Sequence, residues 1–220
     1  MDNSNSVKHN YFPFKTADLL PVSIWVLVFF ITWSFMHGAD HFLELTTEAM
    51  GKYFRYKWIL IIHITAGGGS LILGIIQFWK KLRMYNWQLH RIIGILYLLA
   101  VLSSSFCAVI LAFTTTYEVG LAYAFSLQIW VSVWISATAI AYYFALKKNF
   151  RQHEEWMIRS YIVTMAFVVS GLIYKIPYVQ NLGDFEMVAP SLFWLGWSVP
   201  LYIYEIIRSS KSSLLNKKLA

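Results

Sequence analysis

Long stretches without acidic or basic residues make up most of this chain of 220 residues. A helix needs about 20 mainly apolar residues to cross the hydrocarbon core of a bilayer. In lipid, only helices and closed barrels satisfy all of their backbone polar groups. The sequence therefore predicts an all-α, polytopic transmembrane bundle of six spans. The predicted spans are 21–42, 58–79, 92–113, 121–146, 156–176 and 188–207.

The composition supports the same class. Hydrophobic residues are 58% of the chain and charged residues only 13%, whereas soluble domains have about 45–50% and about 25%. Aromatic residues, at 18%, include many of the Trp and Tyr side chains that favour membrane interfaces. The single cysteine, Cys107, excludes an intramolecular disulfide. The chain contains no Cys-x-x-Cys-His motif, which excludes covalent c-type haem attachment.

The distribution of Lys and Arg predicts the orientation. Cytoplasmic loops carry an excess of basic residues, and here alternate loops are rich in them. The loop after the first span is a mild exception, with Lys52, Arg55 and Lys57, and the loop after the fifth has only Lys175. The alternation places both termini in the cytoplasm. The basic residues of that side are Lys80, Lys81, Arg83, Arg91, Lys147, Lys148, Arg151, Arg159, Arg208, Lys211, Lys217 and Lys218.

These features define the expected partners and location. The net charge of +7 is explained by topology and by contact with anionic lipid headgroups at the cytoplasmic face, so we expect a lipid partner and no nucleic acid. The expected location is a bacterial inner membrane. We divide the chain into a polar N-terminal tail (1–20), the bundle (21–208) and a basic C-terminal tail (209–220).

A first group of candidate ligands lies towards the outer side. The apolar part of the first span ends near Met36, and we expect its helix to continue to Phe42. The spacing i, i+3, i+4, i+7 would then put the imidazoles and carboxylates of this segment on one face. Such a set suits a divalent cation such as zinc or iron. The alternative is an ordinary polar helix end. The predicted metal ligands are His37, Asp40, His41 and, from the second span, His63; Glu44 shares the face.

The second span carries a stripe of small and polar residues around His63. Small residues let another helix or a flat cofactor approach closely, and a histidine inside a membrane is a functional candidate. A helix-packing face with one hydrogen-bonded histidine explains the stripe equally well. The stripe consists of His63, Gly67, Ser70, Gly74 and Gln77.

Two histidines lie at the cytoplasmic boundary, His90 just before the third span and His153 just before the fifth. Arg91 and Arg159 flank them. Arginine forms bidentate contacts with phosphate and carboxylate, so these two residues are candidates to hold haem propionates, an acidic substrate or lipid phosphate. If the fifth helix starts at or before His153, then that histidine shares a face with Trp156, Ser160 and Thr164.

The combined motifs resemble a known family. They are Gly74-x-x-Gln77-Phe78, His90-Arg91-x-x-Gly94-x-x-Tyr97 and His153-x-x-Trp156-Met-Ile-Arg159-Ser-Tyr161. Over roughly 63–174 the chain resembles the bacterial predicted membrane proteins known as domain of unknown function 2306. The resemblance implies a multi-span helical fold and brings no reaction with it.

A more distant analogy is to di-haem cytochromes of the cytochrome b561 kind, which hold each haem between two histidines of different helices. By this analogy His37 and His63 would form an outer pair, and His90 and His153 an inner pair. The sequence leaves three functions open. The first is a redox protein that binds b-type haem or handles quinone, with an electron-transfer partner. The second is a metal-dependent membrane enzyme or metal-handling assembly factor. The third is a non-catalytic scaffold or lipid-interacting protein.

Overall fold

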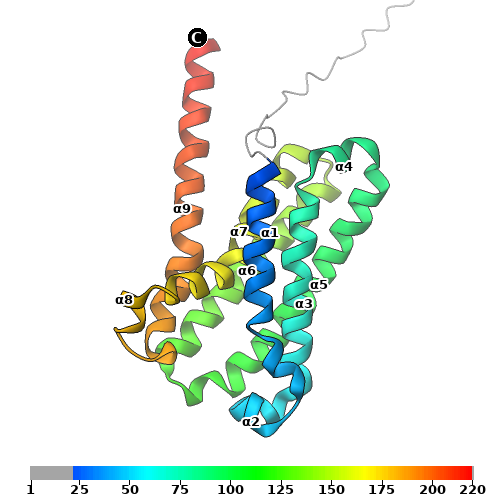
Figure 1. Cartoon of the computed structure of the whole chain (residues 1–220). Coiled ribbons are helices and arrows are strands. Elements are labelled where there is room, and N and C mark those ends of the chain that lie inside the picture. Colours follow the sequence, from blue (N-terminus) through cyan, green and yellow to red (C-terminus); the bar gives the residue numbers. More distant parts are fainter. Residues whose placement is uncertain (1–21, 220) are drawn as a thin grey trace, which may run out of the picture.

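The fold is a bundle of helices that run up and down between two ends (Figure 1). The computed structural model describes residues 22–219, with side chains described for 26–210 except 41, 80 and 81. No strand occurs in this range. The helices are α1 (Val22–His37), α2 (Thr47–Met50), α3 (Lys57–Gln77), α4 (Lys80–Tyr85), α5 (Trp87–Thr114), α6 (Leu121–Leu146), α7 (Phe150–Tyr174), α8 (Pro177–Gln180) and α9 (Phe185–Leu219), with 3-10 segments at Asp40–Glu44, Gly51–Tyr56 and Thr116–Glu118.

Several helices are long and apolar enough to cross a membrane. Within the described part of the chain, four qualify by length and composition: Thr47–Gln77, Trp87–Glu118, Leu121–Leu146 and Phe150–Tyr174. A shorter apolar helix covers Val26–His37. Large apolar side chains lie exposed over the bundle, for example Phe106 at 69% and Leu121 at 72%. An apolar outer surface of this kind suits lipid. The prediction of a multi-span helical membrane protein is confirmed.

The first helix is shorter than predicted. We expected it to continue to Phe42, but α1 ends at His37 and the chain turns at Gly38. The last turn is tightened by bonds from the amides of Gly38 and Ala39 to carbonyls three residues earlier. A 3-10 segment, Asp40–Glu44, follows and ends at Leu45 with φ of 56°. Glycine is a poor helix former. The single helical face predicted for His37, Asp40, His41 and Glu44 was therefore wrong.

The helices that carry the two inner histidines both begin at an asparagine cap. The Asn86 side chain accepts a hydrogen bond from the amide of Leu89 at 2.9 Å, before α5. The Asn149 side chain accepts one from the amide of Gln152 at 3.3 Å, before α7. Asparagine is among the best N-cap residues because it satisfies an otherwise unbonded amide. His153 therefore lies within α7, which starts six residues before the predicted Trp156.

The small-residue stripe of α3 is filled by neighbouring helices. A Cβ added at Gly67 would lie 3.2 Å from the Ser104 hydroxyl of α5, and one at Gly74 would lie 2.2 Å from the ring of Tyr161 of α7. The Tyr161 hydroxyl donates to the carbonyl of Leu71 at 3.0 Å. These contacts favour the helix-packing interpretation of the stripe.

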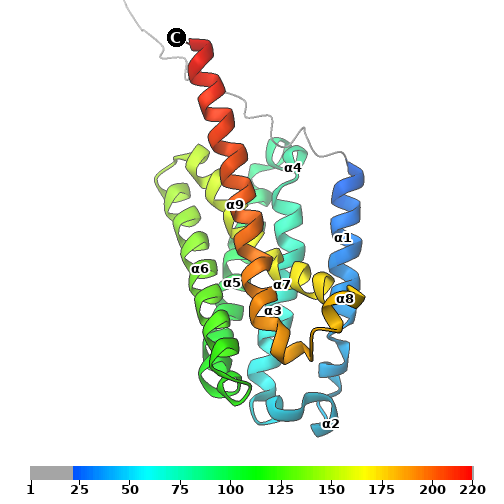
Figure 2. The same cartoon turned by 90° about the vertical axis from the view of Figure 1, so that its left-hand side faces the viewer.

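The remaining helices enclose this centre. Helix α1 lies against α3 and α7, with the Met36 side chain over Gly68 and the Phe35 ring over Gly171. Helix α9 lies against α6 and α7 (Figure 2). A second buried cluster joins α6, α7 and α9. We call the end of the bundle with α4 and the starts of α5 and α7 the α4 end, and the opposite end the α2 end. Helix α9 extends beyond the bundle at the α4 end (Figure 1).

We predict that Gly74→Ala destabilises the bundle by about 1–3 kcal/mol, because overpacking a close contact costs that much. The matched control is Gly69→Ala, where an added Cβ meets nothing within 4 Å. Alanine is the better helix former, so the control should be neutral or slightly stabilising. Denaturant titration of the purified protein in detergent measures both, and equal stability of the two variants would contradict the packing assignment.

Candidate functional site

The α4 end brings His153 of α7 against α6. Its Nδ1 lies 2.9 Å from the carbonyl oxygen of Ala141. A carbonyl only accepts hydrogen bonds, so Nδ1 carries the proton and donates. In the neutral ring, Nε2 then keeps its lone pair. A histidine fixed in this way through a backbone carbonyl has the orientation found for metal-ligating imidazoles.

His90 of α5 is the second histidine of this end. Its backbone carbonyl accepts a hydrogen bond from the buried Gln77 amide of α3 at 2.9 Å. Its Nδ1 is buried and has no hydrogen-bond partner among the described residues. The His90 ring lies close enough to His153 for a charge on one ring to affect the other. The structure therefore brings the predicted inner pair to the same end of the bundle, with one unsatisfied ring nitrogen.

His63 is bonded in the same manner between α3 and α5. Its Nδ1 lies 2.9 Å from the Ser104 carbonyl oxygen, and the Ser104 hydroxyl donates to the His63 carbonyl at 3.0 Å. The same argument gives an Nδ1 proton and a free Nε2 lone pair. This reciprocal pair of bonds joins α3 to α5. It matches the alternative in which a buried histidine bonds a neighbouring helix.

A cluster of hydroxyl groups lies in the core of the bundle, further along α5 and α7 than the inner histidines. The Tyr97 hydroxyl lies 2.8 Å from the Ser160 hydroxyl and 2.9 Å from that of Thr164. Thr138 bonds to Ser160 at 2.7 Å, and the Trp134 indole donates to Thr164 at 2.8 Å. The shared face of Ser160 and Thr164 was predicted, but their partners on α6 were not. Since Thr138 follows Trp134 by four residues, their common face could have been read from the spacing.

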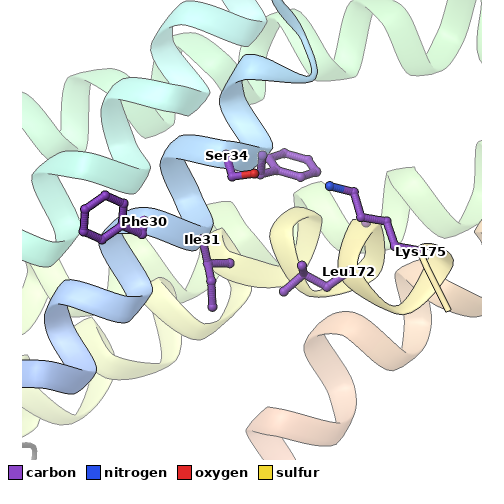
Figure 3. Close-up of a pocket in the computed structure, with 7 residues that line it drawn as sticks. Phe30, Ile31, Ser34, Leu172 and Lys175 are labelled. Atoms are coloured by element: carbon purple, nitrogen blue, oxygen red, sulfur yellow. The ribbon is translucent and has the colours of Figure 1, made fainter.

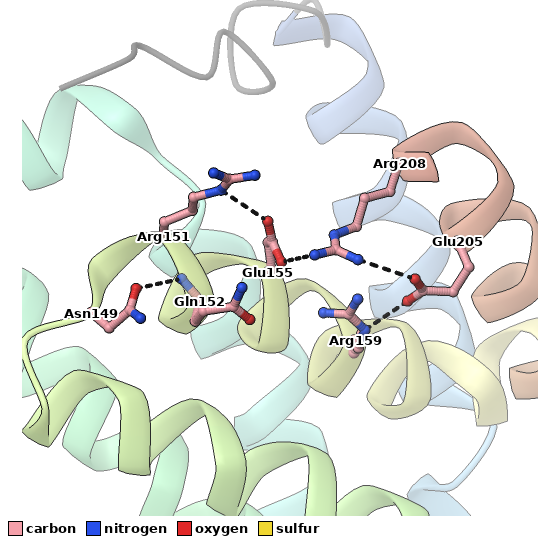
Figure 4. Close-up of polar contacts among 7 residues, drawn as sticks. All are labelled: Asn149, Arg151, Gln152, Glu155, Arg159, Glu205 and Arg208. Atoms are coloured by element: carbon pink, nitrogen blue, oxygen red, sulfur yellow. Dashed lines mark hydrogen bonds and ion pairs between the residues drawn. The ribbon is translucent and has the colours of Figure 1, made fainter. Parts of the chain in front are cut away.

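A network of charges joins α7 to α9 (Figure 4). The Arg159 Nε donates to Glu205 at 2.7 Å, and its guanidinium lies over the rings of Trp156 and Tyr204. Arg208 of α9 donates to Glu155 at 2.5 Å and lies 3.7 Å from Glu205.

Two properties of the network matter for its chemistry. The Glu155 carboxylate lies 3.5 Å from Arg151 and also accepts the hydrogen bond from Arg208. The hydrogen bond between Glu155 and Arg208 raises the pKa of the Arg208 guanidinium. Arg159 Nη1 and Arg208 Nε have no hydrogen-bond partner among the described residues. The bridge from α7 to α9 was not predicted from the sequence, because its partners are far apart in the chain.

The other predicted residues are more scattered. Arg91 is exposed at the α4 end. At the end of α1, His37 Nδ1 lies 2.5 Å from Asp40, and its imidazole packs edge-on against Trp33. The His41 side chain lies outside the described residues. Among the described side chains, no group of three or more His, Cys, Asp or Glu is arranged to hold a metal ion. The outer metal set stays a prediction.

Comparison with known proteins gives one result on family. A family described as "Predicted membrane protein (DUF2306)" matches residues 60–208, which run from the first turn of α3 into α9. No curated protein matches the chain. No solved structure matches it either.

We predict that Glu155→Gln lowers the free energy of unfolding by about 1.5–3 kcal/mol, the range for hydrogen bonds to charged groups. The side chain of Glu155 is only 12% exposed, and glutamine removes the negative charge that pairs with Arg208. Glu154→Gln is the matched control, because Glu154 is 31% exposed and lies 3.5 Å from Arg83. Such surface pairs contribute about 0–1 kcal/mol. Denaturant titration in detergent compares the two, and a larger loss for Glu154→Gln would refute the assignment.

Proposed function

Since the chain belongs to the DUF2306 family of predicted membrane proteins, whose description names no reaction, we propose its function from the geometry of the α4 end. The protein is a redox protein of the membrane that binds b-type haem through His90 and His153. When bound, haem supplies one-electron transfer, with its potential set by the axial ligands and their surroundings.

The orientation of His153 is the observation that carries this proposal. Its Nδ1 is held by the Ala141 carbonyl at 2.9 Å, which fixes the ring and leaves Nε2 as a ligand atom. A ligand held by a second residue in this way keeps its position when the metal is absent. The unsatisfied Nδ1 of His90 supplies the second nitrogen, from a different helix.

Arg159 fits the requirement for an anion partner. Glu205 accepts a hydrogen bond from Nε of the guanidinium, while Nη1 has no hydrogen-bond partner among the described residues. A haem propionate would satisfy this nitrogen. Arg91, exposed at the same end, would bind the second propionate. A quinone is the alternative occupant; in its reduced quinol form a hydroxyl would donate a hydrogen bond to the lone pair of His153 Nε2. In either case an electron-transfer partner is required.

A second function is favoured by different observations. His63 and His153 both donate to carbonyls of neighbouring helices, and the charge network joins α7 to α9. A non-catalytic scaffold would use all of these bonds for packing. It differs from the redox proposal in one respect, since it gives no role to the free Nε2 atoms or to the unsatisfied His90 nitrogen.

The haem proposal predicts a reduced-minus-oxidised spectrum with b-type bands for the purified, haem-supplemented protein. His90→Ala and His153→Ala should each abolish the bands from the α4 end, because both imidazoles would be needed to hold the haem. His37→Ala, at an exposed site of the opposite end, should leave them unchanged.

The other outcomes separate the alternatives. Absence of b-type bands in the wild type excludes haem. Binding of a quinone analogue that is lost in His153→Ala then supports the quinone form. If neither ligand binds and the histidine variants change only stability, the scaffold function holds.

We further propose six spans with both termini in the cytoplasm of a bacterium. Helices α1 and α9 would be the first and sixth, although neither is among the four that qualify by length and composition. The chain turns between consecutive long helices at alternate ends of the bundle (Figure 2). Basic residues such as Lys147, Lys148 and Arg151 lie exposed at the α4 end, which the positive-inside rule assigns to the cytoplasm.

Cysteine labelling tests this topology. In a Cys107→Ala background, a membrane-impermeant maleimide applied to intact cells should modify Glu48→Cys, on α2. It should not modify Lys147→Cys or Ser210→Cys until the membrane is permeabilised. These three residues are exposed in the structure. Labelling of Ser210→Cys together with Glu48→Cys would mean that α9 does not cross the membrane.

A further inference from the structure

A cavity of about 210 Å³ opens between α1 and α7, away from the histidines. Most of its wall is apolar, from Phe30, Ile31 and Phe35 of α1 and Leu172 of α7. One cation, Lys175, borders it. Figure 3 shows the Lys175 ammonium extending from the end of α7 towards Ser34 of α1.

Among the residues whose side chains are described, no carboxylate forms an ion pair with Lys175. In both whole-chain views, α7 ends short of the lower limit of the bundle, which α2 and the start of α6 mark (Figures 1 and 2). Its last residues therefore lie at a depth that neighbouring helices occupy with apolar side chains. A cation at such a depth is costly unless it is paired.

The cavity walls explain what kind of partner would fit. Gly171 lets the two helices approach, since an added Cβ would lie 2.6 Å from the Phe35 ring. The exposed side chains of Phe30 and Leu172 continue the apolar wall onto the outer surface of the bundle. An acyl chain lying on this surface would enter the cavity without crossing any charged group. Its headgroup would then meet Lys175 and the Ser34 hydroxyl.

We propose that this cavity binds a phospholipid with an anionic headgroup, whose phosphate pairs with Lys175 and whose acyl chain lies between α1 and α7. The basis is charge complementarity, an unpaired cation at the mouth of an apolar cavity. A lysine near a helix C-terminus also interacts favourably with the helix dipole, and Lys175 directly follows α7. The experiment must therefore separate lipid binding from helix capping.

The test uses the full chain purified in uncharged detergent, titrated with phosphatidylglycerol or phosphatidylcholine and followed by native mass spectrometry. Phosphatidylglycerol should bind more tightly to the wild type. Lys175→Met should weaken its binding about tenfold, the change expected for one charge-assisted contact, while Lys175→Arg should keep it. Arg55→Met is the matched control, because Arg55 is an exposed basic residue of the α2 end remote from the cavity lining.

Each outcome decides the proposal. Equal binding of the two lipids, or unchanged binding in Lys175→Met, overturns the proposal. If Lys175→Met only lowers the melting temperature of the lipid-free protein and leaves lipid binding unchanged, Lys175 is a helix-capping residue. Ile31→Trp fills the cavity without changing charge and should also weaken phosphatidylglycerol binding, which keeps the test valid if Lys175→Met fails to fold. Oleate as a third ligand identifies the source of the anion: tighter binding than phosphatidylglycerol would replace the phospholipid by a free fatty acid.

Discussion

Hydrogen bonds from side chains to carbonyl oxygens of neighbouring helices determine how this bundle packs. A helical carbonyl has a second lone pair after it accepts its own intrahelical bond, and lipid offers no competing water. His63, His153 and Tyr161 each bond a carbonyl on another helix. So does Trp130, whose indole donates to Val163 at 3.1 Å. Such bonds contribute about 0.6 kcal/mol on average in membranes, so their main effect is to fix which helices meet and in which register.

Because the donors are few, each bond has a specific structural effect. The bond from His63 fixes α3 against α5, and Tyr161 fixes α7 against α3. The small residues Gly67 and Gly74 then allow the backbones to come close enough for those bonds. The same geometry that packs the helices also leaves Nε2 of His63 and His153 free. Packing and ligation are therefore not competing explanations for these histidines, since one bond can serve both.

The sequence predicted the helices better than their connections. The centres of α3, α5 and α6 lie where apolar runs indicated, because length and hydropathy decide a membrane helix. The end of α1 was missed because hydropathy does not register the turn at Gly38. The start of α7 was missed because its first turns are polar, although Asn149 could have marked it as an N-cap.

The candidate site was predicted in part. Since His90 and His153 come just before two apolar segments that begin on the same predicted side, the sequence indicated a shared end, and both lie at the α4 end. The contact of Arg159 with Glu205, and of Glu155 with Arg208, depends on how α9 packs against α7. Neither periodicity nor local spacing carries that information.

Helix α9 is longer than the hydrocarbon core of a bilayer is thick. It has 35 residues, and at about 1.5 Å per residue it is roughly 50 Å long, whereas the hydrocarbon core is about 30 Å thick. Its start packs within the bundle, so the surplus lies at the other end, where the helix stands clear (Figure 1). About 20 Å of α9 would therefore lie beyond the hydrocarbon core, on the side of the bundle that carries the exposed basic residues Lys147, Lys148 and Arg151.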